Sequence, residues 1–370
     1  MPKITLNWLA LLCLTLISCR DENTITPPQI SGLRFIGEQV IPYNTQFQSS
    51  TVGGLSAIDY HNNTWFLLSD DKNEPRFYTA TLSFDEDSFH TIELLAKVDL
   101  LDINNQAFQA EAPDPEALRL HPKTNQIIWT SEGDMNKGIN PFVRIASPTG
   151  QFINEIELPE LFHANSSLGG PRLNGVFEGV CIDTNYEGYW VSLEEPLIQD
   201  GEEASFFSSE KSPIRISYIN QTSTQFGEQY AYQLDKVARR PIPSDGFSVN
   251  GVVELLALSK TTLLVLERSY AVGYVDGGNN VKIYQADLTH ATDVSKINAL
   301  ATHTFTPVTK TLLFDFETIR DELTQNRVDN IEGMAFGPTL PNGNRSLVLV
   351  SDNNFNPIQL TQLLVFEVMP

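Results

Sequence analysis

Carboxylic acids recur at fixed places in this 370-residue sequence, at both ends of a hairpin pattern that occurs five times. The positions at which the hairpins begin are Ser56, Glu116, Glu178, Glu254 and Glu332. The positions at which they end are Asp70, Glu132, Glu194, Glu267 and Asp352. Because the first residue of one antiparallel strand lies beside the last residue of the next, we expect both sets at the same end of every hairpin.

Carboxylates gathered in this way favour one of three arrangements. Like charges so close cannot all stay ionised unless they bind hard cations, pair with arginine or have raised pKa values. Lys72, Arg76, Arg172 and Arg268 lie near the same hairpin ends and offer contacts for anions. The alternative interpretation is that each acid caps a turn through backbone N–H groups. Recurrence in five units favours a functional ring.

The elements that must position these acids are predicted to be strands. Short β-rich segments alternate with turn residues, and no helical periodicity dominates. The hairpins begin 60 to 78 residues apart, and further strand pairs lie between them. These pairs are 76–82 with 91–98, 142–146 with 152–158, 214–219 with 229–234, and 281–287 with 301–306. Four strands per unit predict an all-β, single-domain β-propeller of about five blades, with six as the alternative.

The two ends of the domain are expected to meet. The last unit has only three strands, the final one over 362–368, and a strand over 33–41 can supply the fourth. Such closure removes exposed sheet edges. One helix is predicted over 315–326, because Ile319 and Leu323 fall four residues apart on one face.

Composition excludes several classes of protein. With 41% hydrophobic residues, the chain can bury a sizeable core and is not a disordered protein. Its 46 acidic and 24 basic residues give a net charge of −22, which disfavours nucleic-acid binding and suits cation binding. The sequence also lacks a Gly-x-Ser-x-Gly elbow, a P-loop, a dinucleotide fingerprint and a His-Glu-x-x-His motif.

The N-terminus has the pattern of a targeting segment. An apolar run over 4–17 follows Lys3 and is too short to span a bilayer, which is typical of a signal peptide. Leu16-Ile17-Ser18-Cys19 resembles the lipobox of bacterial lipoproteins, in which the cysteine becomes the lipidated N-terminus. Arg20-Asp21-Glu22 resembles the surface-export signal of Bacteroidetes lipoproteins. An ordinary signal peptide is the alternative.

These features predict a signal peptide over 1–18, a lipidated tether over 19–30 and a propeller domain over 31–370. The expected location is the cell envelope, in the outer membrane through the lipid anchor and exposed at the surface. Cys181, inside the apolar run Val180-Cys181-Ile182, is predicted to be a buried, inert thiol.

The repeated hairpins resemble the esterase-like phytase family of secreted bacterial proteins over residues 50–369. The resemblance rests on motifs such as Gly54-Leu55-Ser56-Ala57-Ile58, Asp114-Pro115-Glu116-Ala117, Phe177-Glu178-Gly179-Val180, Leu193-Glu194-Glu195-Pro196-Leu197, Leu266-Glu267-Arg268 and Asn330-Ile331-Glu332-Gly333-Met334-Ala335. The departure is Glu254-Leu255, because the other hairpins that begin with glutamate carry a small residue next. This departure weakens the fourth hairpin as a contributor to the site.

The resemblance implies hydrolysis of phosphate esters, or of other small-molecule esters, with calcium as the cofactor. The implied catalytic acids are Glu132, Glu178, Glu194 and Glu332, any of which can be the base. The implied calcium ligands are Asp70, Glu116, Glu178, Glu194, Glu332 and Asp352, and Lys72, Arg76 and Arg268 would hold the substrate. The expected partners are this substrate and the membrane, for a protein acting as a monomer. The alternative is a non-catalytic, surface-displayed propeller that binds a glycan, a lipid or a protein.

Overall fold

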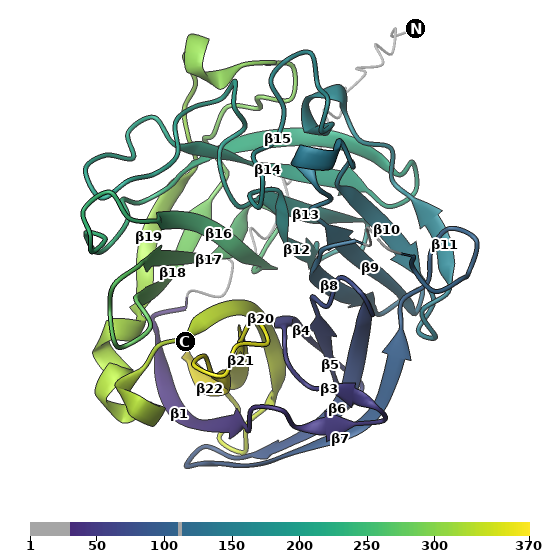
Figure 1. The fold of residues 1–370 in the computed structure, drawn as a ribbon, viewed down its shortest axis with the longest axis vertical. Coiled ribbons are helices and arrows are strands. Elements are labelled where there is room, and N and C mark those ends of the chain that lie inside the picture. The colour runs from purple at the N-terminus through teal and green to yellow at the C-terminus, as the bar shows by residue number, and fades with distance from the viewer. Residues whose placement is uncertain (1–29, 110–112) are drawn as a thin grey trace, which may run out of the picture.

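The protein is described by a computed structural model over residues 30–109 and 113–370. Five four-stranded antiparallel sheets surround a central axis as the blades of a propeller (Figure 1). The all-β fold and the five blades are therefore confirmed, and the six-blade alternative is excluded. Within the described ranges no helix is long and apolar enough to cross a membrane.

The strands of each blade follow one another from the axis outward. Blade 1 holds β4 (Leu55–His61), β5 (Thr64–Ser69), β6 (Arg76–Phe84) and β7 (Phe89–Asp99). Blade 2 holds β8 (Pro115–His121), β9 (Gln126–Ser131), β10 (Phe142–Ala146) and β11 (Phe152–Glu155). Blade 3 holds β12 (Phe177–Ile182), β13 (Gly188–Leu193), β14 (Pro213–Asn220) and β15 (Gln225–Gln233). Blade 4 holds β16 (Ser248–Ala257), β17 (Thr262–Ala271), β18 (Asn279–Asp287) and β19 (Thr309–Asp315).

Blade 5 closes the ring with both ends of the domain. It holds β20 (Asn330–Thr339), β21 (Arg345–Asp352), β22 (Thr361–Met369) and, outermost, β1 (Gly32–Ile41). Gly32 lies opposite Met369 and Ile41 lies opposite Thr361. The predicted pairing of the N-terminal and C-terminal strands is confirmed. A two-stranded ribbon, β2 (Gln46–Phe47) with β3 (Ser50–Thr51), follows β1.

The apolar core lies between neighbouring blades. Strands near the axis are buried on both faces, so their sequences are continuous apolar runs and do not alternate between apolar and polar residues. The segment from Leu263 to Leu266 on β17, for example, is completely buried. Side chains from adjacent blades pack together in this way around the ring, as Trp129 of blade 2 and Leu68 of blade 1 belong to the same buried cluster.

Two predicted elements were wrong in detail. Residues expected to form one helix form two 3-10 helices, η4 (Phe316–Glu322) and η5 (Thr324–Asn326), because Leu323 between them is extended, with φ −88° and ψ 154°. Residues 301–306 are not the fourth strand of blade 4, which is β19. Instead, the connection from β18 to β19 follows blade 3: Val294 N–H donates to Gln229 O and Val308 N–H to Ala231 O. It includes η3 (Leu300–Thr302); the other short helices are η1 (Met135–Lys137) and η2 (Glu160–Phe162).

Every inner strand contains a one-residue bulge at the same level. The bulged residues are Ser56, Glu116, Glu178, Val253 and Glu332. A bulge re-aims a side chain and interrupts strand pairing. Blade 4 therefore has valine where three other blades have glutamate, and Glu254 occupies the next position, where the other inner strands carry alanine or glycine.

Glu254 instead belongs to an ion pair that fills the channel between the inner strands. Its Oε2 lies 2.5 Å from the guanidinium of Arg119, and both side chains are buried. Arg119 donates to the carbonyl oxygens of Ile58, Leu118 and Met334 at 2.8, 2.9 and 3.0 Å, and Glu254 accepts from Val180 N–H at 3.2 Å. One pair thereby joins the inner strands of all five blades.

Replacing Arg119 with alanine should destabilise the protein by about 3–5 kcal/mol, because it leaves the Glu254 carboxylate buried without its counter-ion. The double variant Arg119→Met with Glu254→Leu should be more stable than this single variant. Urea unfolding measures both, with Lys137→Ala as a control at a surface pair. A loss below 1 kcal/mol for Arg119→Ala would show that the channel pair does not hold the blades together.

Candidate functional site

Seven carboxylates gather at the mouth of the channel where the hairpins begin and end. Three belong to bulged residues, and four directly follow or end the second strand of a blade: Glu116, Glu178, Glu332, Asp70, Glu132, Glu194 and Asp352. Oxygens of Glu132, Glu178 and Glu194 lie within 4.8 Å of one another, and so do oxygens of Asp114, Glu116 and Glu132. The predicted grouping of these acids is therefore present. We call these seven residues the acidic ring.

Burial raises the pKa of every member of the acidic ring, and repulsion by other ring acids adds to it at five of the seven: Asp70, Glu116, Glu132, Glu178 and Glu332. Desolvation is the largest cause throughout. The neighbouring Glu194 carboxylate adds to it at Glu132, whose pKa rises to about 8. The pKa of Asp352 rises to about 6, where hydrogen bonds from Asn354 and Asn330 oppose the effect of burial. The ring is thus short of positive charge.

Among residues 30–109 and 113–370, Arg268 is the one cation that the sheet register places within the ring. It lies opposite Gly251, at the level where the other blades carry Asp70, Glu132, Glu194 and Asp352. Its Nη2 is 2.9 Å from Glu194 Oε1 and 3.4 Å from Glu332 Oε1, while its Nε has no partner among the described residues. This placement agrees with its predicted role as an anion contact, which stays a prediction.

Two of the nine acids at the predicted hairpin ends do not join the ring, and the tenth position is Ser56. Glu254 is held in the channel by Arg119, and Glu267 is displaced by one residue relative to the leaving acids of the other blades. Glu267 instead accepts hydrogen bonds from Tyr232 at 2.6 Å and Asn250 at 2.9 Å, and pairs with Lys310. The expected nine-carboxylate ring was therefore wrong in blade 4, because its bulge falls on Val253.

A glycine makes room for the Glu194 carboxylate. A Cβ atom at Gly251 would lie 2.3 Å from Cγ of Glu194, which no side chain can accommodate without movement. Gly54 has a similar role at Asp70: its φ is +60°, and a Cβ atom there would lie 1.9 Å from Oδ1 of Asp70. At both glycines the backbone thus comes close to a carboxylate, across to the neighbouring blade at Gly251 and within blade 1 at Gly54.

Protein hydrogen bonds satisfy only part of the ring. Glu132 Oε1 accepts from Val176 N–H at 2.6 Å, and Asn330 Nδ2 donates to Glu332 at 2.8 Å and to Asp352 at 3.3 Å. Oδ1 of Asp70 is buried and has no partner among the described residues. Buried oxygens without donors are costly, so the arrangement favours an additional cation.

The geometry of the ring fits a calcium ion. Ca²⁺ takes six to eight oxygen ligands at about 2.3–2.6 Å, so two ligands on opposite sides of the ion lie about 5 Å apart. In each group of three carboxylates, one oxygen per residue lies within 4.8 Å of the other two, which agrees with this spacing. All donors in the two groups are carboxylate oxygens, which also suits a hard cation. Glu132 belongs to both groups and would lie between two ions.

The other predicted basic residues have different surroundings. Lys72 pairs with Asp114 at the rim of the ring, and its side chain is 59% exposed. Arg76 is buried and donates to Asp71, Tyr78, Thr51 and Glu74, so its guanidinium is largely engaged by the protein. Arg172 pairs with Glu203 at 3.1 Å, in the long connection of blade 3. The substrate-binding roles of Lys72 and Arg76 and the anion contact at Arg172 stay predictions, with Lys72 more available than Arg76.

Sequence reasoning missed two acids beside the ring. Asp114 is buried and completes the group with Glu116 and Glu132. Glu195 is buried next to Glu194, and burial with the repulsion of Glu194 raises its pKa to about 8. Asp114 lies two residues before Glu116, and Glu195 directly follows Glu194. Their closeness in the sequence to predicted site acids was the signal that could have identified them. Cys181 is buried with a raised thiol pKa, which confirms that it is not a nucleophile.

The chain matches the phytase-like family, described as "esterase-like activity of phytase", over residues 50–355. The protein belongs to the phytase-like family. The match spans both groups of three carboxylates and Arg268, and it supports a hydrolase-like propeller. No curated protein is similar to the chain at a significant level.

Solved structures that resemble this phytase-like protein do so distantly. A thermostable family-43 glycoside hydrolase has 12% identity and a TM-score of 0.46, covering 85% of this chain and 88% of its own. The catalytic domain of Coprinopsis cinerea GH62 α-L-arabinofuranosidase has 10% identity and a TM-score of 0.45, with coverages of 92% and 98%. Myxococcus xanthus glutaminyl cyclase has 9% identity and a TM-score of 0.40, with coverages of 91% and 97%. These similarities carry no inference about substrate.

The raised pKa values predict that stability depends on pH and on calcium together. Glu132 and Asp352 bind protons more tightly when folded, so the stability they contribute is complete below their unfolded pKa values near 4. This contribution is lost as the pH rises through about 6 to about 8. In chelator, the melting temperature should therefore fall between pH 5 and pH 8.5.

Calcium should oppose this fall, because it binds ionised carboxylates. A hundredfold excess over its dissociation constant adds about 2.7 kcal/mol. Thermal melts at both pH values, with calcium and with chelator, measure the effect. Glu132→Gln should flatten the pH dependence in chelator, whereas Glu187→Gln, at an exposed turn, should not. A calcium effect that is equal at pH 5 and pH 8.5 would contradict this account of the ring.

Proposed function

We propose that the protein hydrolyses phosphate esters with the help of calcium bound in the acidic ring. One observation carries the proposal: two groups of three carboxylates, sharing Glu132, lie within cation-binding distance of one another. Membership of the phytase-like family supports the same reaction class. Calcium, when bound, would neutralise the phosphate oxygens and make the phosphorus easier to attack.

The calcium ligands would come from four blades. Glu132, Glu178 and Glu194 would hold one ion, and Asp114, Glu116 and Glu132 would hold a second. Asp70, Glu332 and Asp352 lie on the other side of the ring, where the repulsion between Asp70 and both other acids marks their proximity. These three are the remaining candidate ligands.

The protein's own side chains would orient the substrate and move protons. Arg268, with an unpartnered Nε, can donate to a phosphate oxygen from the blade-4 side. A ring carboxylate that is not a metal ligand can accept the proton of the attacking water. With Glu132, Glu178 and Glu194 holding calcium, Glu332 is the remaining candidate among the four predicted catalytic acids. As the new P–O bond forms, the ester P–O bond breaks, and the alcohol leaves with a proton from a protonated ring acid.

Activity assays test the proposal directly. The full chain should hydrolyse p-nitrophenyl phosphate or phytate in calcium and lose this activity in chelator. The double variant Glu178→Gln with Glu332→Gln should lose about a hundredfold or more in kcat/KM, because removing ligands or a base has an effect of this size. Glu187→Gln should keep full activity. A lack of activity toward both phosphate esters and carboxylic esters would favour a non-catalytic binding propeller.

We further propose that the protein is a lipid-anchored, monomeric component of the cell envelope. Cys19, the predicted lipidation site, lies outside the described residues. Strand β1 begins at Gly32 beside Met369, at the end of blade 5 remote from Asp352, so the described chain starts on the face opposite the acidic ring. An anchor there would turn the mouth away from the membrane. Mass spectrometry of the native protein should find a lipidated Cys19; a mature N-terminus that retains Met1 would refute it.

A further inference from the structure

Blade 4 extends farther above the acidic ring than the other blades. Leu55, Pro115 and Phe177 open the inner strands of blades 1 to 3, whereas the equivalent residue of blade 4, Val252, is preceded by four more residues of β16. Strand β17 likewise continues three residues beyond Arg268. Gly251 and Arg268 lie at the level of the ring, so three residues of each strand lie above it, which at about 3.3 Å per residue is a rise of about 10 Å. We call this extension the blade-4 wall.

Large apolar side chains are exposed on the blade-4 wall and beside it. Phe247 and Phe207 are each 67% exposed, Ile242 is 57% exposed and Val275 is 98% exposed. Backbone bonds connect three of these segments: Ile242 N–H donates to Val272 O, and Val272 N–H donates to Phe247 O. A group of apolar side chains on one surface of a soluble domain marks an interaction site more often than scattered ones do.

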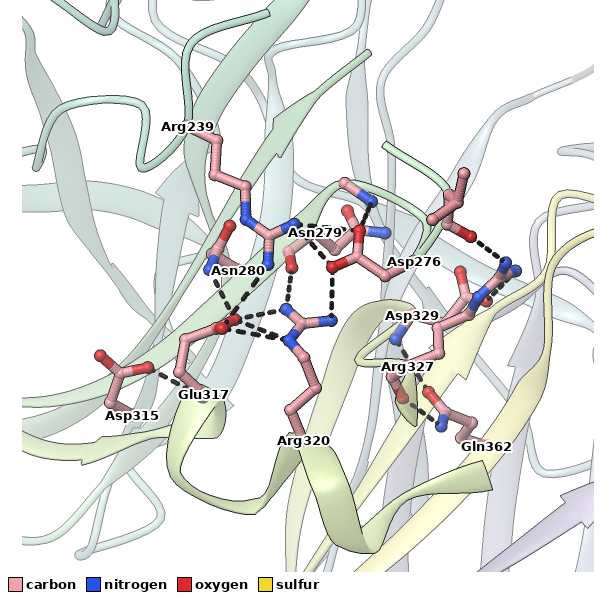
Figure 2. Close-up of polar contacts among 12 residues, drawn as sticks. Arg239, Asp276, Asn279, Asn280, Asp315, Glu317, Arg320, Arg327, Asp329 and Gln362 are labelled. Carbon is pink, nitrogen blue, oxygen red and sulfur yellow. Dashed lines mark hydrogen bonds and ion pairs between the residues drawn. The ribbon is translucent and has the colours of Figure 1, made fainter. Parts of the chain in front are cut away.

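Half-buried polar contacts hold this exposed surface in place (Figure 2). Asp276, next to Val275, accepts two hydrogen bonds from Arg239 at 2.9 and 2.7 Å and lies 3.6 Å from Arg320. Arg327 donates to the carbonyl oxygen of Val275 at 3.1 Å. Arg320 also pairs with Glu317 of η4. Since these groups fix a loop whose tip is apolar, the surface is pre-organised for binding, which lowers its entropic cost.

The charge on this side of the mouth is also distinctive. In a protein of net charge −22, the connection from β15 to β16 carries Lys236 and Arg240, both exposed. The Arg240 guanidinium lies 5.7 Å from the ring centroid of Phe207, so cation and apolar surface are combined. Arg268 stands at the foot of the wall, within the acidic ring. An anionic group at the ring and an apolar group along the wall would both find complementary partners.

We propose that the blade-4 wall binds the apolar alcohol portion of the substrate, so that the protein acts on amphiphilic phosphate monoesters. The inference rests on the proposed function, because it places the phosphate at the acidic ring. The distance from the ring to Phe247 determines which alcohol portions can contact the wall. A short alcohol leaves the wall uncovered, whereas a long alkyl chain reaches it. Burial of each further methylene then strengthens binding.

Alkylphosphonates provide a test that does not depend on turnover, because their P–C bond is not an ester. Calorimetric titration of the full chain in calcium should use methylphosphonate, butylphosphonate and decylphosphonate below their aggregation limits. We expect decylphosphonate to bind at least about tenfold more tightly than methylphosphonate, with butylphosphonate close to methylphosphonate. Phe247→Ser should remove most of the gain for the decyl compound and leave methylphosphonate unchanged.

A second variant and a control separate the outcomes. Phe207→Ser should also weaken decylphosphonate, whereas Leu95→Ser, at an exposed residue of β7, should not. Equal affinities for methyl and decyl compounds would overturn the inference and leave the proposed function standing. Decyl binding that is unaffected by Phe247→Ser and Phe207→Ser would overturn it too. If methylphosphonate fails to bind with calcium present, the proposed function fails, and the inference with it.

Discussion

Repulsion among the buried carboxylates of the acidic ring is the constraint on which the rest of this structure depends. Seven acids face one another at one mouth of the channel, and in the described part of the chain the register places a single guanidinium, that of Arg268, among them. Water would normally screen such charges, but burial removes most of it and raises every pKa in the ring. A fold that keeps these groups together therefore either stores protons or binds cations. The spacing of the two groups of three oxygens suits the second solution at neutral pH.

The propeller brings these acids together through a local backbone feature that is repeated in each blade around the axis. A bulge near the start of each inner strand aims one side chain into the mouth, and the second strand ends with another at the same level. In blade 4 the bulge falls on Val253, which moves Glu254 into the channel and brings Arg268 into the ring. The displaced Glu254 pairs with Arg119 and joins the inner strands. A one-residue offset thus produces both the cation at the site and the ion pair at the centre of the fold.

The sequence predicted the parts that depend on short-range patterns. Alternation of strands and turns, the repeat of hairpins and the missing fourth strand in the last unit were enough to predict five blades closed by β1 and β22. The grouping of Glu178 with Glu194 followed from antiparallel geometry. The offset in blade 4 was visible only as a large residue after Glu254, since a bulge leaves no other local signal. The pairing of Arg119 with Glu254 joins residues on different blades, and residues 301–306 lie elsewhere because of contacts with β15. Such long-range contacts are not encoded in local spacing.

A crystal structure grown in calcium, with anomalous scattering recorded, tests the central claim most directly. The account predicts an anomalous peak bounded by carboxylate oxygens of Glu132, Glu178 and Glu194 at calcium–oxygen distances of about 2.3–2.6 Å. Crystals of Glu178→Gln with Glu332→Gln should keep the fold and lose that peak. An acidic ring with no anomalous density at millimolar calcium, and with carboxylates bonded directly to one another, would contradict the account and show that the ring stores protons instead.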